Sequence, residues 1–243
     1  MIYLKEFGTD AEYNAYITGS TAFHPNTSLI GSTDVKFEKV PDPYIMVDLG
    51  LPSGTKWCNK NLGASSETEY GDYFAWGETT PRGADWATTS PYVWAHAPFN
   101  NGSSSFDSTY FASVSGTVCP NNLLALEYDA AHVQLGGAWR MPTSGQVQEL
   151  IDNTTSDWTE NYQGSGISGS IFTSKTNGNA IFIPASGYRY NSHVCIVGIG
   201  AFLWSSTLDS DDPDHAYHLI FDSGGGAFFY NVRSDGFCVR PVC

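Results

Sequence analysis

The spacing of apolar segments is the feature that most constrains how this chain folds. The segments are short, of strand length, and residues 171–173, 180–183 and 217–221 are examples. Turn residues interrupt them, and Asn177-Gly178, between the first two, is a strong signal for a tight β-hairpin. Many short strands and few helices predict a loop-rich α+β fold with a small twisted antiparallel sheet.

Two short helices are expected around this sheet. Asp129 suits the N-cap of a helix over residues 129–135, and Gly136-Gly137 ends it. The second helix begins at Thr143, which can form a capping box with Gln146. Its buried face is expected to carry Val147, Leu150 and Ile151.

The composition is that of a folded chain. Aromatic residues make up 14% of it and charged residues only 15%, whereas a disordered chain has few aromatics and many charges. Residues 80–118 are rich in Ser, Thr, Asn, Gly and Pro, with scattered aromatic residues. We therefore expect a loop there, ordered by aromatic side chains rather than by regular structure.

The character of the sequence changes near residue 44. Residues 1–43 predict a separate N-terminal arm that serves for attachment or packing, with a short helix near residues 9–17 and a short strand over residues 35–40. Residues 44–243 carry the strand and helix signals described above and are expected to form one domain.

The net charge of −14 bears on partners and location. Such a surface repels phosphate backbones and anionic lipids, so neither nucleic acid nor membrane insertion is expected. No apolar run approaches the length of a transmembrane helix, and the first residues lack the apolar core of a signal peptide.

The five cysteines are Cys58, Cys119, Cys195, Cys238 and Cys243. Their number is odd and no CxxC pair is present, so the sequence predicts neither a zinc site nor a disulfide framework. A single disulfide stays open, and Cys58 with Cys238 is the pair to examine.

Five ordered motifs carry a family resemblance. They are residues 47–57 (VDLGLPSGTKW), 73–78 (YFAWGE), 139–143 (WRMPT), 204–207 (WSST) and 236–242 (GFCVRPV). Over residues 44–243 the chain resembles the major paralogous domain family of gut bacterial surface proteins. That family is similar to the formylglycine-generating-enzyme branch of the C-type lectin fold. The resemblance implies a C-type-lectin-like fold in which Trp57, Trp76, Trp139, Trp204, Arg140 and Arg240 belong to the scaffold. Residues 1–43 resemble, over a short match, the N-terminal arms of structural proteins of phages and prophages.

Some proteins of this fold carry a C-terminal surface that a diversity-generating retroelement rewrites. Adenine mutagenesis of Asn codons cannot produce Lys, Glu, Gln, Met or Trp. Residues 191–243 contain none of the first four and a single tryptophan, Trp204, which lies in a scaffold motif. The resemblance together with this composition predicts a diversified variable protein.

The residues between the scaffold motifs are the candidates for a ligand-binding surface. Phe228-Phe229-Tyr230 breaks the alternation of a half-buried strand, so at least one of these aromatic side chains should face solvent. Aromatic residues mixed with Ser, Asp and His are typical of a paratope. The candidates are Ser192, His193, Cys195, Ile196, Ile199, Phe202, Asp209, Asp211, Asp212, Asp214, His215, His218, Ile220, Asp222, Ala227, Phe228, Phe229, Tyr230, Val232, Ser234 and Asp235.

The same segment contains residues that could bind a metal. Four aspartates between residues 209 and 214 could hold calcium, but the EF-hand spacing and the sugar–calcium motifs of true C-type lectins are absent. His215 and His218 are three residues apart and would lie on opposite faces of a strand. We therefore expect no metal and no other cofactor.

Two cysteines are the candidates for catalysis. Cys195 and Cys238 could be cast as the cysteine pair of a formylglycine-generating enzyme, but neither lies in a catalytic motif of that family. We therefore expect a non-enzymatic receptor-binding protein, phage or prophage encoded and displayed on a virion or cell surface. Its partner would be a protein or glycan receptor, and the arm would contact particle proteins. The alternative is a non-diversified adhesin or structural domain of a gut bacterium.

Overall fold

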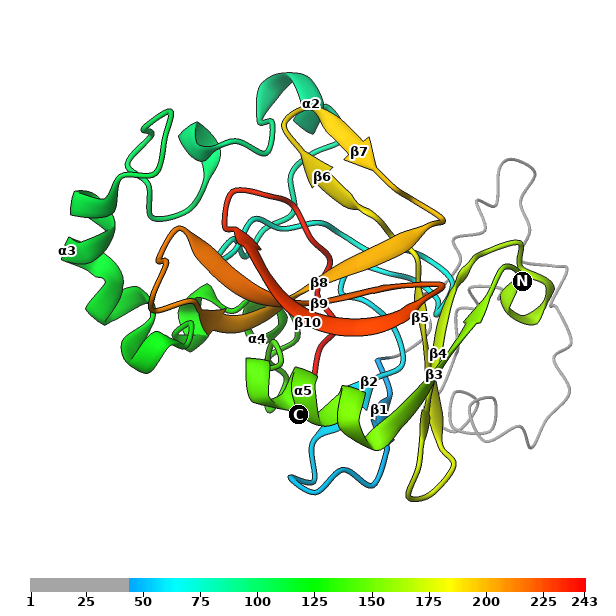
Figure 1. The fold of residues 1–243 in the computed structure, drawn as a ribbon. Coiled ribbons are helices and arrows are strands. Elements are labelled where there is room, and N and C mark those ends of the chain that lie inside the picture. Colours follow the sequence, from blue (N-terminus) through cyan, green and yellow to red (C-terminus); the bar gives the residue numbers. More distant parts are fainter. Residues whose placement is uncertain (1–43) are drawn as a thin grey trace, which may run out of the picture. The chain divides into compact units, whose positions relative to one another are not determined.

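Short helices and small antiparallel sheets make up the fold in the computed structural model, which describes residues 44–243. The helix and strand expected within residues 1–43 lie outside the described residues. The helices are α2 (Trp86–Thr89), α3 (Ser108–Val118), α4 (Ala130–Leu135) and α5 (Ser144–Asn153). The strands are β1 (Met46–Asp48), β2 (Lys56–Cys58), β3 (Thr154–Thr159), β4 (Gly169–Ser174), β5 (Ala180–Pro184), β6 (Tyr188–Tyr190), β7 (His193–Cys195), β8 (Gly200–Leu208), β9 (His215–Asp222) and β10 (Gly225–Val232). The predicted α+β class is confirmed (Figure 1).

Four small antiparallel sheets form within the described residues, in place of the single sheet expected. β1 pairs with β2, β6 pairs with β7, and two three-stranded sheets have the orders β3–β4–β5 and β10–β9–β8. The hairpin predicted around Asn177-Gly178 is the β4–β5 pair, and Gly178 has the positive φ that such a turn needs.

The two predicted helices are confirmed, together with their caps. The Asp129 side chain accepts a hydrogen bond from the His132 N–H at 2.9 Å at the start of α4. Thr143 and Gln146 form the expected capping box of α5, in which Val147 and Leu150 are buried.

Residues 80–118 differ from the expected loop, because they contain α2 and all of α3. The Tyr110 N–H donates to Asp107 at 2.9 Å, so Asp107 is a regular N-cap for α3. The helix is rich in Ser and Thr, which are weak helix formers. Burial of Phe111 and Val118 against the core therefore stabilises a helix that composition alone does not favour.

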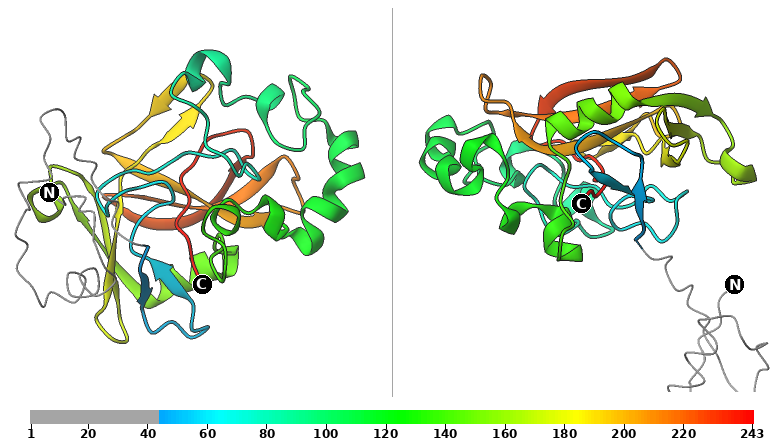
Figure 2. Two further views of the ribbon diagram at one scale, coloured as in Figure 1. Left: turned by 180° about the vertical axis from the view of Figure 1, so that it is seen from behind. Right: turned by 90° about the horizontal axis from the view of Figure 1, so that it is seen from below.

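The β8–β10 sheet separates two hydrophobic clusters. Alternating residues point to opposite faces, so Leu219 and Phe221 pack on one side, with α5 and the β4–β5 strands. Phe202 and Trp204 pack on the other side, against Phe237. Figure 2 shows α5 lying along this sheet.

The end of the chain, residues 236–242, is buried and joins distant segments by backbone hydrogen bonds. Phe237 pairs with Phe74, Cys238 accepts from Trp204, Val239 accepts from Leu62, and Val242 pairs with Arg140. The last residue pairs with Lys56, so the C-terminus lies beside β2 (Figure 2).

Arg240 is fully buried within this segment, and its guanidinium donates three hydrogen bonds. Nε donates to the Asn61 side chain at 2.8 Å, Nη1 to the Cys58 carbonyl at 3.0 Å and Nη2 to the Phe182 carbonyl at 2.9 Å. The expected scaffold role of Arg240 is confirmed, and Trp57, Trp76 and Trp204 are buried as well. Trp139 and Arg140 are partly exposed.

All five cysteines are free thiols, so the Cys58–Cys238 disulfide is not formed. Within residues 44–243, none of the helices has the length and apolar character needed to span a membrane.

We predict that Arg240→Lys lowers the free energy of unfolding by about 3 kcal/mol, because an ammonium group cannot reach all three acceptors of the planar fork. Urea denaturation measures this change. Arg140→Lys, at a partly exposed arginine, is the control and should change stability by less than about 0.5 kcal/mol. Equal effects of the two substitutions would contradict the role given to Arg240.

Candidate ligand-binding surface

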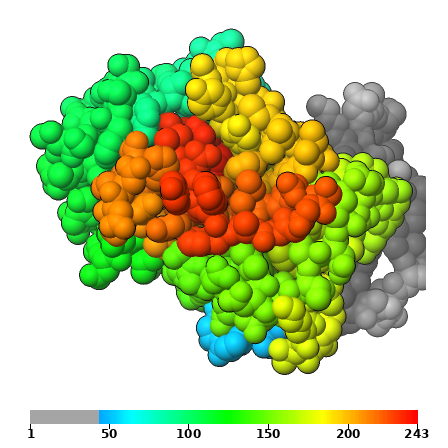
Figure 3. Space-filling view, viewed as in Figure 1, coloured from blue at the N-terminus to red at the C-terminus, as the bar shows by residue number. Residues whose placement is uncertain are grey.

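Large exposed apolar side chains gather on the part of the molecule formed by residues 190–230. Seven of the thirteen such side chains among the described residues lie there, including Ile199 at 63% exposure, Phe229 at 56% and Tyr190 at 55%. Figure 3 shows the segments after about residue 185, coloured yellow to red, side by side on one face. We call this surface the C-terminal face. It comprises the exposed residues of 190–199, of the loop 209–214 and of the β9–β10 hairpin.

Most of the predicted site residues lie on or near this face. Sixteen of the twenty-one candidates are at least partly exposed, and five are buried. The exposed ones are Ser192, His193, Ile196, Ile199, Asp211, Asp212, Asp222, Ala227, Phe229 and Tyr230. The partly exposed ones are Cys195, Asp214, His215, Ile220, Phe228 and Val232.

The five buried candidates are corrections to the predicted surface: Phe202, Asp209, His218, Ser234 and Asp235. Phe202 and His218 point from β8 and β9 toward Phe237, so strand alternation turns them inward. Ser234 and Asp235 lie directly before the buried C-terminal segment, residues 236–242, and are buried with it. A rule based on codons carries no information about burial, so it could not separate these residues from their exposed neighbours.

Three large apolar residues that are exposed on this face are not among the predicted site residues. Val194 and Val197 lie between predicted site residues and satisfy the same codon rule, and Tyr190 lies one residue before the segment that was tested. The β6–β7 hairpin, which carries Tyr190 and Val194, was not expected, and its outward side chains were therefore not assigned.

The β6–β7 hairpin is fixed to the body of the protein on two sides. Asn191, in its turn, exchanges backbone hydrogen bonds of 3.0 and 2.8 Å with Tyr92, and Arg189 exchanges two with Gly236. Gly187 precedes β6 with φ +60°, and a Cβ there would collide with the Cys195 carbonyl oxygen. The hairpin is therefore held in one position before any ligand arrives.

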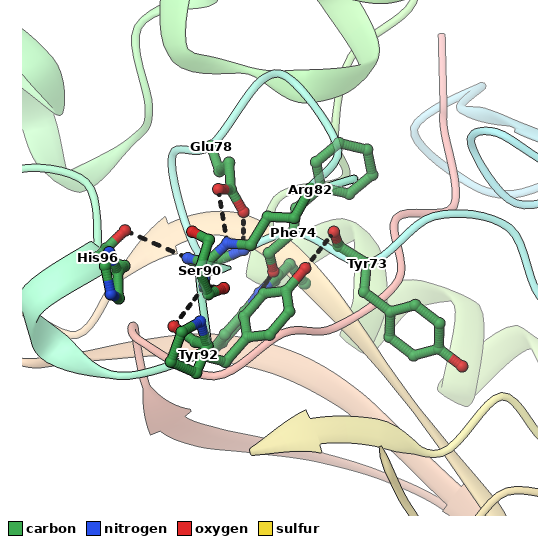
Figure 4. A network of polar contacts seen from close by, with 10 residues as sticks. Tyr73, Phe74, Glu78, Arg82, Ser90, Tyr92 and His96 are labelled. Atoms are coloured by element: carbon green, nitrogen blue, oxygen red, sulfur yellow. Dashed lines mark hydrogen bonds and ion pairs between the residues drawn. The ribbon is translucent and has the colours of Figure 1, made fainter. Parts of the chain in front are cut away.

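Arg82 organises the loop behind this hairpin (Figure 4). Its Nε donates to Glu78 at 2.9 Å, and its Nη1 donates to the carbonyls of Ser90 and Pro91, each at 2.7 Å. The guanidinium lies 3.9 Å from the centre of the Tyr92 ring. The Tyr92 hydroxyl in turn donates to the Tyr73 carbonyl at 2.6 Å. Arg82 thereby fixes Tyr92, which binds the hairpin turn.

Aromatic rings cover the edge strand β10. Phe229 and Tyr230 stack with their centroids 5.0 Å apart, although they are consecutive residues. Tyr217 lies opposite Tyr230 in the strand register, and its ring stacks on Phe228 at 4.7 Å. The prediction that at least one of the three β10 aromatics faces solvent is confirmed, because Phe229 and Tyr230 are both exposed.

The loop before β9 brings carboxylates against these rings. His215 Nδ1 lies 2.6 Å from Asp214 Oδ1 and 3.1 Å from Asp212 Oδ2, and the His215 ring contacts Tyr230 edge-on at 5.4 Å. A hydrogen bond with Asp214 raises the pKa of Asp212. Asp212, Asp214 and His215 offer ligand atoms within 4.8 Å of one another, which is the one such group of three found among residues 44–243. These three residues could contact a cation, but three ligands are fewer than calcium requires.

Two buried polar groups lie beneath the C-terminal face. His218 is 1% exposed, both of its ring nitrogens lack a hydrogen-bond partner, and burial lowers its pKa to about 3. Asp235 is 3% exposed, its Oδ1 lacks a partner, and burial raises its pKa to about 7. Both groups are therefore uncharged at mildly acidic pH, which is what an apolar surrounding favours.

The two cysteines weighed for catalysis are in different environments. Cys238 is completely buried, and burial raises its pKa to about 12. Cys195 is partly exposed on β7. A buried thiol with a raised pKa is protonated at neutral pH and is a poor nucleophile.

A surface cavity of about 390 Å³ lies beside α3. Phe111 and Cys119 line it from the helix side, and Leu208 and Pro213 line it from the β8–β9 connection. Ser210 and Pro213 of the loop 209–214 line it, so the cavity adjoins the C-terminal face, although none of the aspartates of that loop is among its walls.

Comparison of the chain with protein-family models, with curated proteins and with solved structures finds no match.

We predict that Asp235→Asn stabilises the protein by about 3 kcal/mol at pH 8 and changes little at pH 4.5. Between about pH 4 and about pH 7 the carboxyl of residue 235 ionises in the unfolded chain but stays protonated in the folded protein. The free energy of unfolding therefore falls as the pH rises through this window. The variant has no carboxyl to ionise. Urea denaturation at the two pH values measures the difference, and an equal effect at both would contradict the burial of an uncharged Asp235.

His218→Leu is expected to give the opposite pH dependence. The lowered pKa means that the unfolded chain binds a proton below about pH 6.5 while folded His218 stays neutral until about pH 3, so stability is lost as the pH falls. We therefore predict that the variant gains about 2 kcal/mol more at pH 4.5 than at pH 8. A gain independent of pH would mean that His218 titrates normally in the folded protein.

Proposed function

We propose that residues 44–243 adopt a C-type-lectin-like fold and form a receptor-binding domain whose C-terminal face a diversity-generating retroelement varies. The observation that carries this proposal is that, in the last part of the chain, motif residues are buried while many of the residues between the motifs are exposed. The motif residues Trp204 and Gly236–Val242 are buried, whereas ten of the residues between the motifs are exposed on one face.

The physical character of the face supports binding. It combines exposed aromatic and aliphatic side chains with small polar residues and aspartates, as many protein-recognition surfaces do. An exposed apolar patch of this kind raises the free energy of the isolated protein unless a ligand covers it. The fixed β6–β7 hairpin lowers the ordering cost of association, so affinity would come from a preorganised surface.

The fold assignment has its own support. The last residues of the described domain pair with β2, near its start, through the Trp57–Val242 and Lys56–Cys243 backbone contacts. The domain also contains two capped helices, α4 and α5, beside its antiparallel sheets. Those features agree with the motif resemblance in residues 47–57 and 236–242.

The proposed setting is a phage or prophage particle that displays the domain toward a protein or glycan receptor. A non-diversified adhesin or structural domain of a gut bacterium would use the same face without variation. A thiol enzyme of the formylglycine-generating kind is not favoured, because the Cys238 thiol is buried and its pKa is raised.

Sequencing of the gene's surroundings and of the locus across a cell population tests this proposal. We expect a reverse transcriptase gene, a near-identical template repeat, and substitutions at the sixteen exposed or partly exposed candidates. The five buried candidates, His218 and Asp235 among them, should vary less. Most substituted side chains at these positions would not fit the core or would bury a polar group without a hydrogen-bond partner. An invariant locus without a template would leave the fixed adhesin as the better account.

A further inference from the structure

The distribution of charge on the C-terminal face is one-sided. Between Tyr190 and Val232 the chain has five aspartates and neither lysine nor arginine. Arg233 follows directly but is fully buried, where its Nε donates to the Pro213 carbonyl at 2.8 Å, so it adds no exposed cation to the face. Four of the aspartates lie in the loop 209–214, and Asp222 lies at the other end of β9. A surface with this composition attracts cations and repels anions.

The carboxylates and the exposed aromatic rings form one continuous group. Asp212 and Asp214 contact His215, whose ring meets Tyr230 edge-on. Tyr230 lies 6.3 Å from Tyr217, centroid to centroid. The Asp211 N–H donates to Asp209 Oδ1 at 3.1 Å in the same loop. Burial, followed by the charges of these two aspartates, raises the pKa of Tyr217.

We call this group the acidic–aromatic corner and define it as Asp211, Asp212, Asp214, His215, Tyr217 and Tyr230. Ring faces attract cations through their quadrupole, and carboxylates accept charge-assisted hydrogen bonds from ammonium and guanidinium groups. The stem of a lysine or arginine can lie on an aromatic surface while its charged end reaches a carboxylate.

We infer that the acidic–aromatic corner binds a lysine or arginine side chain presented by a protein receptor. Phe229 and the exposed apolar residues of 190–199 would contact the apolar receptor residues that flank this basic side chain. The inference rests on the proposed function, since it names the class of ligand for the same face. A neutral glycan could stack on the rings but would offer no cation to the exposed carboxylates. An acidic glycan would be repelled.

The test uses the full chain and a phage-displayed library of random dodecapeptides selected at low salt. We expect enrichment of peptides that carry Lys or Arg beside an apolar residue. Binding of a selected synthetic peptide should weaken about tenfold with Tyr230→Ala and also with the Asp212→Asn, Asp214→Asn double variant. It should weaken again at about 0.5 M salt.

Matched controls lie elsewhere on the surface. Tyr110→Ala removes a tyrosine that is 36% exposed on α3, and Asp157→Asn removes an exposed carboxylate on β3. Neither should change peptide binding. Asp211→Asn is a second corner variant if circular dichroism finds that the double variant does not fold.

The outcomes separate the inference from the proposed function. If basic peptides are not enriched over acidic ones, the inference is overturned. If uncharged peptides, or sugars from an oligosaccharide array, bind and lose binding with Phe229→Ala and Ile199→Ala but not with the aspartate variants, the inference fails and the proposed function stands. If Phe229→Ala and Ile199→Ala leave all binding unchanged, the proposed function fails too.

Discussion

The buried guanidinium of Arg240 joins its own C-terminal segment to two parts of the chain that are far away in sequence. Its acceptors belong to residues 58–61 and to β5, and burial lowers its pKa to about 10, so it stays cationic at neutral pH. The surrounding residues 236–242 add backbone pairs to further segments. A protein with such short strands has few long ladders, and this segment supplies the connections that regular structure does not.

This buried connection explains how binding residues and structural residues can alternate in one stretch of sequence. The backbone from β8 onward is fixed by the sheet, by Phe237 and by Arg240, while side chains on the outer positions make few structural contacts. The β6–β7 hairpin is also fixed, because its turn is hydrogen-bonded to Tyr92, whose ring packs against Arg82. Substitution of Ile199 or Phe229 should therefore alter the surface and leave the fold intact.

Local signals predicted the local structure well. The caps at Asp129 and Thr143 and the Asn177-Gly178 turn depend on neighbouring residues, so the sequence reveals them directly. Helix α3 was missed because its stability comes from burial of Phe111 and Val118 against distant segments. The burial of His218 and Asp235 was missed for the same reason, since strand pairing and the course of the C-terminal segment are not local properties. The positions between the scaffold motifs include most of the exposed face, but their spacing does not tell outward side chains from inward ones.

A mutational scan for protease resistance over residues 188–243 tests the central claim, that a variable face rests on an invariant scaffold. Every single substitution would be displayed and scored for stability in one experiment. The account predicts broad tolerance at Ile199, Phe229 and Tyr230 and intolerance throughout residues 236–242. Equal sensitivity in the two groups would contradict it, because the face would then be part of what stabilises the fold.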